Sequence, residues 1–305
     1  MSFVSPEKPA RLFPAPDGAV GRVLAPVPLP EIAFCQAVER SDVLGAYALL
    51  YDCYLERGLI RPNRTGLRYT HFNLLPESAT FVAKAGDEVI ATLSAIIETR
   101  AFGIPMWELY ADELQGLRSR GFRFAEGSGL AVDPAYRPIG MHLVMNLVKM
   151  AITYARKLGA TFATIACHPR HARFYRQVFL FEEFGERRTY GAVNDAPAVA
   201  LGLDLADLEQ TYRRATSGEG DGIYRFFFTD EIFRCPNTAL RSAALGKSVV
   251  QELLALQPFL IEAIETRAPG TVAALTGWEA PDVADRRGSA EASPLWEEVP
   301  AFIAA

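Results

Sequence analysis

The stretch from residue 124 to residue 181 constrains the fold more than any other part of this sequence. Two short apolar runs, at residues 124–134 and 160–167, flank a long segment with helical apolar periodicity. A loop that contains Gly140 opens the helical segment. Two strands joined by a helix that follows a glycine-containing loop form a βαβ unit. The sequence therefore predicts a pair of parallel strands with a crossover helix.

The loop before this helix is suited to a phosphate group. The first N–H groups of a helix have no partner within it and, with the helix dipole, form an anion site. Gly127 and Gly129 interrupt the strand upstream, which indicates a bulge or another backbone lying alongside. A phosphopantetheine arm carries amides that could pair with such a strand. The residues expected to hold this arm and its phosphate are Leu130, Ala131, Val132, Arg137, Gly140, Met141 and His142.

The order of these elements resembles the core of the GNAT acyltransferase superfamily. The loop of that superfamily, Gln/Arg-x-x-Gly-x-Gly/Ala, corresponds here to Arg137-x-x-Gly140-x-His142, and a Phe174-Tyr175 pair follows on a later helix. Within the superfamily, the chain most resembles the long-chain N-acyl amino acid synthases, which are related to autoinducer synthases. The stretches that carry this narrower resemblance are residues 47–58, 102–122 and 190–205.

The resemblance implies an α/β (α+β) GNAT fold, with a mixed, mostly antiparallel central sheet flanked by helices. We expect this domain at residues 31–214. The prolines of residues 1–30 predict an extended arm before it. Residues 215–278 are expected to form a linker and a mainly helical C-terminal extension. Residues 279–305, rich in Ala, Glu, Asp, Ser and Pro, are predicted to be disordered.

Local patterns place the remaining elements. Ser41 is predicted to cap a helix that ends at Gly58, and its tyrosine stripe is interpreted as a core face in preference to a pocket lining. Residues 224–233 are predicted to form a strand or a docked segment. The other predicted elements are a strand at 32–38, a hairpin of 80–84 and 89–97, a helix over 105–118, an antiparallel pair at 182–190 and 197–204, and helices over 207–214, 243–267 (which Pro258 can break) and 271–278.

Composition excludes several classes of protein. The net charge of −5 argues against a general nucleic-acid or membrane-surface binder. The four cysteines are scattered with no Cys-x-x-Cys pair, so neither a metal site nor a disulfide framework is expected. No apolar run is long enough to span a bilayer, and the N-terminus has no apolar signal core. We therefore expect a cytoplasmic protein without an integral membrane segment.

Acyl transfer to an amine requires a group that takes a proton from the amine and one that gives a proton to the leaving thiolate. Glu126, a carboxylate in an apolar strand, is interpreted as a general base or an anion that orients the amine; the alternative is a salt-bridged residue at a strand end. The resemblance to autoinducer synthases favours the first. The superfamily's sulfur-protonating tyrosine corresponds to Tyr175, whose alternative is a core aromatic residue.

Substrate contacts are predicted at five further residues. Arg68 or Arg100 could hold the carboxylate of an amino acid. His168 could touch substrate or cap the loop. Trp107 and Tyr110 share an apolar helix face that could be a wall for a long acyl chain or an ordinary packing face.

His142 and Pro138 leave the loop with fewer donors than the superfamily pattern, which suits one phosphodiester better than coenzyme A. The resemblance likewise implies acyl carrier protein as the partner, and such acidic proteins require a basic docking face. The two candidate faces are Arg118, Arg120 and Arg123, and Arg170, His171, Arg173 and Arg176; each could also be an ordinary solvated face.

Taken with these residues, the resemblance implies an N-acyltransferase that moves a long-chain fatty acyl group from acyl carrier protein to the α-amine of an amino acid. No cofactor is expected to be tightly bound; the co-substrate is acyl-phosphopantetheine or acyl-CoA. Three alternatives stay open: an acetyl-CoA-dependent acetyltransferase, an enzyme like the acyl-homoserine lactone synthases, and a noncatalytic sensor or docking module.

Overall fold

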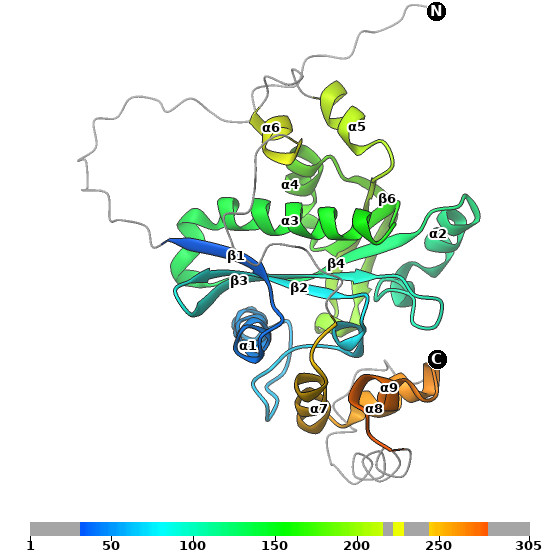
Figure 1. Cartoon of the computed structure of the whole chain (residues 1–305). Coiled ribbons are helices and arrows are strands. Elements are labelled where there is room, and N and C mark those ends of the chain that lie inside the picture. Colours follow the sequence, from blue (N-terminus) through cyan, green and yellow to red (C-terminus); the bar gives the residue numbers. More distant parts are fainter. Residues whose placement is uncertain (1–30, 216–221, 229–243, 280–305) are drawn as a thin grey trace, which may run out of the picture.

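The structure is a computed structural model that describes residues 31–215, 222–228 and 244–279. At its centre is a seven-stranded sheet in the order β1-β2-β3-β4-β5-β7-β6, and helices lie on both faces (Figure 1). The strands are β1 (Ile32–Gln36), β2 (Ala79–Ala85), β3 (Glu88–Ile97), β4 (Phe124–Val132), β5 (Phe162–Cys167), β6 (Glu182–Tyr190) and β7 (Ala196–Asp204). The helices are α1 (Arg40–Glu56), α2 (Trp107–Ser119), α3 (Gly140–Lys157), α4 (Pro169–Phe179), α5 (Leu208–Ala215), α6 (Gly222–Phe228), α7 (Lys247–Leu256), α8 (Phe259–Arg267) and α9 (Thr271–Thr276).

Neighbouring strands are antiparallel except β4 and β5, which are parallel. Helix α3 connects these two strands, so the predicted βαβ unit is confirmed. The predicted mixed, mostly antiparallel sheet and the helical C-terminal region are confirmed as well.

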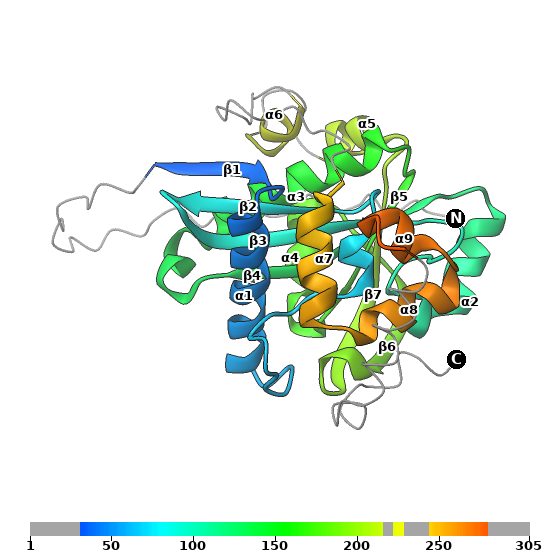
Figure 2. The same ribbon diagram turned by 60° about the horizontal axis from the view of Figure 1, so that its bottom comes forward.

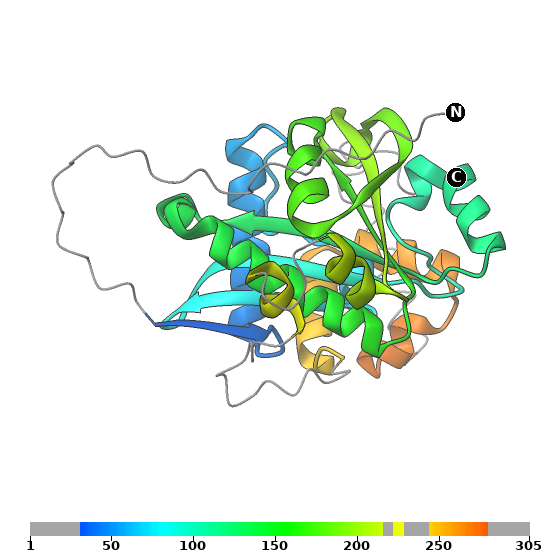
Figure 3. The same ribbon diagram turned by 90° about the horizontal axis from the view of Figure 1, so that it is seen from above.

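Helix α3 covers one face of the sheet. Its residues Leu143, Leu147, Met150 and Tyr154 are fully buried and recur at intervals of three or four, which places them on one side of the helix. Figure 3 shows α3 running across the strands, with the yellow α6 on its outer side. There the Lys149 ammonium donates a hydrogen bond to the carbonyl of Phe226.

Helix α1 and the C-terminal helices share the opposite face. Val43 and Tyr47 of α1 are buried in the same apolar cluster as Val250 and Leu253 of α7 and Ile261 of α8. Figure 2 shows α7 beside α1 in front of the strands. The C-terminal helices therefore complete the core of this face.

Strands β4 and β5 separate soon after they begin. They pair only through Phe124–Phe162, Ala125–Ala163 and Glu126–Thr164. On its other edge β4 stays paired with β3, but one extra β4 residue enters between the pairs Ser94–Ser128 and Thr92–Ala131. Gly129 sits in this bulge with φ +66°, a conformation that glycine adopts without strain. The bulge that the strand glycines indicated is confirmed, and β4 diverges from β5 beyond Glu126.

Two local predictions need correction. Ser41 does not cap α1: the helix begins at Arg40 after Glu39, which has extended backbone and makes no side-chain cap hydrogen bond. Residues 224–228 belong to helix α6 and are not a strand; this segment docks, since Tyr224 is buried and the Phe227 ring contacts Tyr212.

The prediction for residues 229–233 lies outside the described residues, as do those for the arm (1–30), residues 216–221 of the linker and the tail from residue 280. The predicted break at Pro258 in the helix over 243–267 is confirmed, because this residue lies between α7 and α8.

Candidate active site

The fork between β4 and β5 opens into one cavity of ≈ 1490 Å³. Ala125 and Glu126 are successive β4 residues whose side chains leave opposite faces of the sheet, and both line the cavity. The cavity therefore passes through the sheet at the fork. The β4 residues from Gly127 to Val132 and the β5 residues from Ala163 to Cys167 form its two sides.

Glu126 lies at the root of the fork. Its side chain is 3 % exposed, and its Oε2 accepts a hydrogen bond of 2.7 Å from the Met106 backbone N–H. Burial raises the pKa of Glu126 to about 8, and the nearby Glu108 carboxylate adds to the rise while the Met106 hydrogen bond opposes it. This carboxyl group can therefore exchange a proton near neutral pH.

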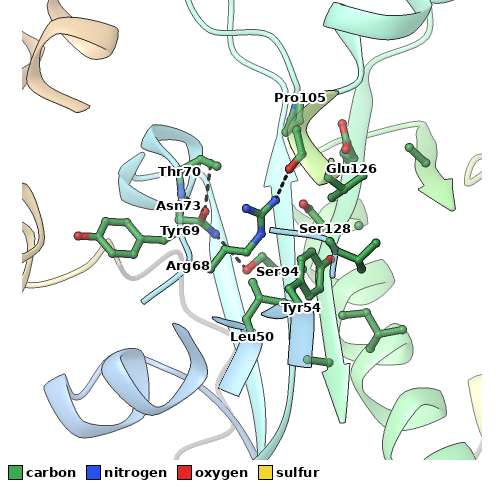
Figure 4. A pocket seen from close by; sticks show the side chains of 18 of the residues that line it. Leu50, Tyr54, Arg68, Tyr69, Thr70, Asn73, Ser94, Pro105, Glu126 and Ser128 are labelled. Atoms are coloured by element: carbon green, nitrogen blue, oxygen red, sulfur yellow. Dashed lines mark hydrogen bonds between the residues drawn. The ribbon is translucent and has the colours of Figure 1, made fainter. Parts of the chain in front are cut away.

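Arg68 extends from its loop toward the side of the β4 residues Glu126 and Ser128, and Tyr54 of α1 lies beside it (Figure 4). Its guanidinium donates to the Ala192 carbonyl at 2.9 Å and lies 4.8 Å from the centre of the Tyr54 ring. Burial lowers the pKa of Arg68. Tyr190 lines the cavity as well. Burial raises the pKa of Tyr190, the Glu126 charge adds to the rise, and the Arg68 charge opposes it. We call this region, lined by Tyr54, Arg68, Glu126 and Tyr190, the polar branch.

Sequence reasoning missed two residues of the polar branch. Tyr54 ends the tyrosine stripe of α1, which was interpreted as a core face; Tyr47 and Tyr51 are indeed buried, but Tyr54 reaches the cavity. Tyr190 carried no signal, since nothing in its neighbourhood indicates that β6 ends beside the fork. A stripe that continues to the last turn of a helix was the available clue for Tyr54.

The other side of the fork carries Tyr175, from α4, and Cys167, at the end of β5, and both line the cavity. Burial raises the pKa of Tyr175, and the Cys167 and Tyr54 groups add to the rise. Among the described residues, none forms a hydrogen bond with the Tyr175 hydroxyl. Tyr175 is thus a protonated phenol available to a ligand.

His168 caps α4, with its Nδ1 accepting a hydrogen bond of 3.2 Å from the Arg170 N–H, and it also lines the cavity.

An apolar branch of the cavity runs between the sheet and α3. Sequence reasoning did not find it. Small side chains at one-turn spacing on α3, Ala151 and Ala155, leave room where a larger residue would fill the core. The residues that line this branch are Leu93, Ala95, Ala125, Val148, Ala151, Ile152, Ala155 and Ala163.

The predicted phosphate loop borders the cavity without entering it. Leu130, Ala131 and Val132 line the cavity, whereas Arg137, Gly140, Met141 and His142 are not among its lining residues in the described chain. A Cβ on Gly140 would lie 3.8 Å from Val132 Cγ1, so the loop adjoins the cavity at this point.

Arg137 pairs with Glu56 at 3.0 Å, with about half of each side chain exposed (49 % and 53 %). Such an exposed pair contributes at most about 1 kcal/mol, so Arg137 can turn to a phosphate at little cost. Five basic residues line the cavity mouth and are called the basic rim: Arg57, Arg61, Arg64, Arg170 and His171.

Three predicted site residues lie apart from the cavity. Arg100 is in an exposed turn. The Tyr110 side chain is fully buried beneath α2, and its hydroxyl donates to the Glu186 and Ala198 carbonyls. Trp107 Nε1 donates to Glu98 at 3.2 Å. In the described chain, the face that carries Trp107 and Tyr110 packs against the protein core.

The comparisons with known proteins agree with this geometry. The family model described as "N-acyl amino acid synthase FeeM" matches residues 45–204, which is more than half of the chain. The chain belongs to this family. The protein is therefore an acyltransferase.

Among solved structures, this acyltransferase is similar to FeeM, an N-acyl amino acid synthase from uncultured soil microbes, with 26 % identity and a TM-score of 0.52; the match covers 60 % of this chain and 95 % of that one. Two acyl-homoserine lactone synthases also match. LasI has 13 % identity, a TM-score of 0.46 and coverage of 62 % and 94 %. The CoA-dependent BjaI has 16 % identity, a TM-score of 0.43 and coverage of 60 % and 88 %. A search of curated proteins finds no significant match.

No helix in the described part of the protein combines the length and the apolar character needed to cross a membrane.

Proposed function

We propose that the enzyme transfers a long-chain fatty acyl group from acyl carrier protein to the α-amine of an amino acid. One observation carries the proposal: a single cavity joins the apolar branch beneath α3, the fork, and the polar branch around Arg68. A fatty acyl chain suits the apolar branch, and a zwitterionic amino acid suits the polar branch. The thioester would then lie at the fork, between the two substrates.

Each polar group has a role in this arrangement. The β4 edge from Gly127 to Val132 does not pair with β5, so its backbone groups can pair with the amides of the phosphopantetheine arm and donate to the thioester oxygen. Glu126 takes a proton from the amine, directly or through a water molecule. Arg68 holds the carboxylate of the amino acid with paired donors.

The reaction balances without a further reactant. The amine nitrogen attacks the thioester carbon, the C–N bond forms, and the C–S bond of the resulting tetrahedral intermediate breaks. Because the zwitterion carries an ammonium group, its nitrogen loses two protons in all. Glu126 takes each in turn and passes one to solvent, while the other returns through water to Tyr175, which has given its own proton to the departing sulfur. The products are an N-acyl amino acid and the free thiol of the carrier arm.

Acyl carrier protein is the proposed donor because of the charge at the cavity mouth. Arg57, Arg61 and Arg64 of the basic rim are exposed, and none of them forms an ion pair within the described residues. An acidic partner would supply the missing counter-charges. The Arg118 face is less suited, because Arg118 already pairs with Glu98 and lies over the Trp107 ring.

The test is mass spectrometry of organic extracts from cells that overexpress the enzyme. New long-chain N-acyl amino acids should appear, and they should vanish with Glu126→Gln but persist with the exposed Glu182→Gln as the matched control. Extracts without acylated amino acids would contradict the proposal, and acyl lactones in their place would favour the lactone-synthase alternative. Purified enzyme then distinguishes the donors: acyl carrier protein should support faster transfer than acyl-CoA of the same chain length, and the reverse order would refute the proposed donor.

A further inference from the structure

Helices α7 and α8 meet at a corner, formed by Gln257 and Pro258, that lies outside the matched family region. The family model ends at residue 204, and FeeM matches only 60 % of this chain although 95 % of FeeM is covered. The corner is therefore an addition to the catalytic unit that the family shares.

The corner is fixed to the segment that carries Arg68. The Tyr69 hydroxyl donates to the Leu253 carbonyl at 2.7 Å, and Gln257 Nε2 donates to the Leu67 carbonyl at 3.4 Å. Both donating side chains are buried. These two bonds hold the residues directly before and after Arg68. Figure 4 shows the consequence: Arg68 extends toward β4, while Tyr69 points the opposite way.

The same corner forms part of the cavity wall. Its lining residues are Leu256, Gln257, Pro258, Phe259, Leu260 and Ala263, which are mostly apolar. Leu256 is 40 % exposed, a high value for a leucine whose neighbours Leu253 and Leu254 are buried. Apolar surface left open on a cavity wall is typical of a place where a ligand binds.

Helix α8 packs against the turn at His71–Leu74. The Arg267 charge lowers the pKa of His71 and acts against the rise in the pKa of Glu108, and Glu108 in turn acts on Glu126. His71 lines the cavity between these groups, and burial lowers its pKa to about 3, so it is neutral. Helix α8 thus follows the polar branch, where the proposed function places the acceptor.

We propose that the α7–α8 corner is the acceptor-side wall of the active site and that it selects amino acids with large apolar side chains. This inference rests on the proposed function. An acceptor held by its carboxylate at Arg68 and by its amine at Glu126 has one free direction left, for its side chain. Leu256 and Phe259 line the same cavity with apolar surface, and neither can pair with a charged side chain.

The test measures kcat/KM for a panel of amino acids with one fixed acyl donor. Leu256→Ala and Phe259→Ala should each reduce the preference for large apolar over small or acidic acceptors at least tenfold, mainly through the KM of the acceptor, while the KM of the donor stays unchanged. Leu256→Lys should shift the preference toward aspartate and glutamate. Because Leu256 is partly exposed, the substitutions at 256 should leave the fold intact; Phe259→Ala, at a half-buried site, should lower stability as well.

Val272→Ala is the matched control. Val272 is fully buried in the same apolar cluster and does not line the cavity, so its truncation should lower the melting temperature without changing the order of acceptors. A wild-type enzyme that prefers small or charged acceptors, or variants at 256 and 259 that keep the wild-type order, would overturn the inference while the proposed function stands. Failure of the wild type to acylate any amino acid would instead overturn the proposed function, and this inference with it.

Discussion

Glu126 lies opposite Thr164 in the last pair that joins β4 to β5. Beyond this pair the two strands diverge, and the space between them becomes the cavity. The carboxylate is therefore placed where the sheet opens, at the meeting point of the apolar and polar branches. A one-residue shift in the register would turn this side chain to the α3 face.

The first prediction concerns the pH dependence of activity. A base must be ionised to accept a proton, and burial raises the pKa of Glu126 to about 8. We expect kcat/KM to rise with pH, by up to about tenfold per pH unit, and to level off above roughly pH 8. A pH–rate profile of the wild type measures this limb. The Glu126→Gln profile separates Glu126 from the substrate amine: the residual activity should lack the limb, and a limb that persists in the variant would belong to the substrate.

The same group should make stability depend on pH. In the unfolded chain a glutamate titrates near pH 4.3, whereas Glu126 in the folded chain titrates near 8. The folded state therefore holds its proton more tightly, and stability falls as the pH rises through this window, at about 1.4 kcal/mol per unit of pKa difference as an upper limit. Measured from pH 5 to pH 9, the melting temperature of Glu126→Gln should gain on that of the wild type up to about pH 8 and then stay parallel. Glu182→Gln, at an exposed site, should show no such trend.

Tyr175→Phe tests the proton donor. The raised pKa keeps the phenol protonated through the working range, so the substitution removes a donor and leaves the ring. We expect kcat to fall roughly 100-fold, as is common for loss of a general acid, with little change in either KM. Tyr136→Phe is the control, because Tyr136 packs against the same core cluster without lining the cavity. Wild-type kcat in Tyr175→Phe would assign this tyrosine to packing alone.

Arg68 and Arg100 were equal candidates for the carboxylate until the structure separated them. Arg68 lines the cavity and Arg100 does not. A charge-assisted hydrogen bond contributes about 1.5–3 kcal/mol, so Arg68→Gln should raise the KM of the amino acid roughly 10- to 100-fold. Arg100→Gln should leave this KM unchanged. Steady-state kinetics with the donor at saturation measures both, and the opposite result would move the carboxylate site to the turn at Arg100.

Local signals account for what the sequence revealed. The glycine loop and apolar runs predicted the βαβ unit, Gly129 predicted the bulge, and Pro258 predicted the break between α7 and α8. The site depended on longer-range facts. Glu126 and Tyr175 were predicted from the sequence, and both line the cavity, but nothing local shows that β4 and β5 stop pairing after Glu126. The wall for an acyl chain was sought at Trp107 and Tyr110, where periodicity indicates only that a face is apolar, not which space it faces.

The last prediction concerns the apolar branch. Ala151 lies on the α3 side of this branch, where a larger side chain would project into the space between helix and sheet. Each methylene of a bound chain contributes about 0.8 kcal/mol, or roughly fourfold in affinity, as long as there is room for it. Ala151→Leu should therefore shift the preferred acyl chain to one shorter by about two to four carbons, because the terminal methylenes no longer fit. Transfer rates over a series of acyl donors measure the optimum chain length.

Ala46→Leu is the control: Ala46 is buried in α1 and does not line the cavity, so its enlargement should lower stability without moving the optimum chain length. An unchanged optimum in Ala151→Leu would show that the acyl chain lies elsewhere, and the space beneath α3 would then be a packing defect and not a substrate site.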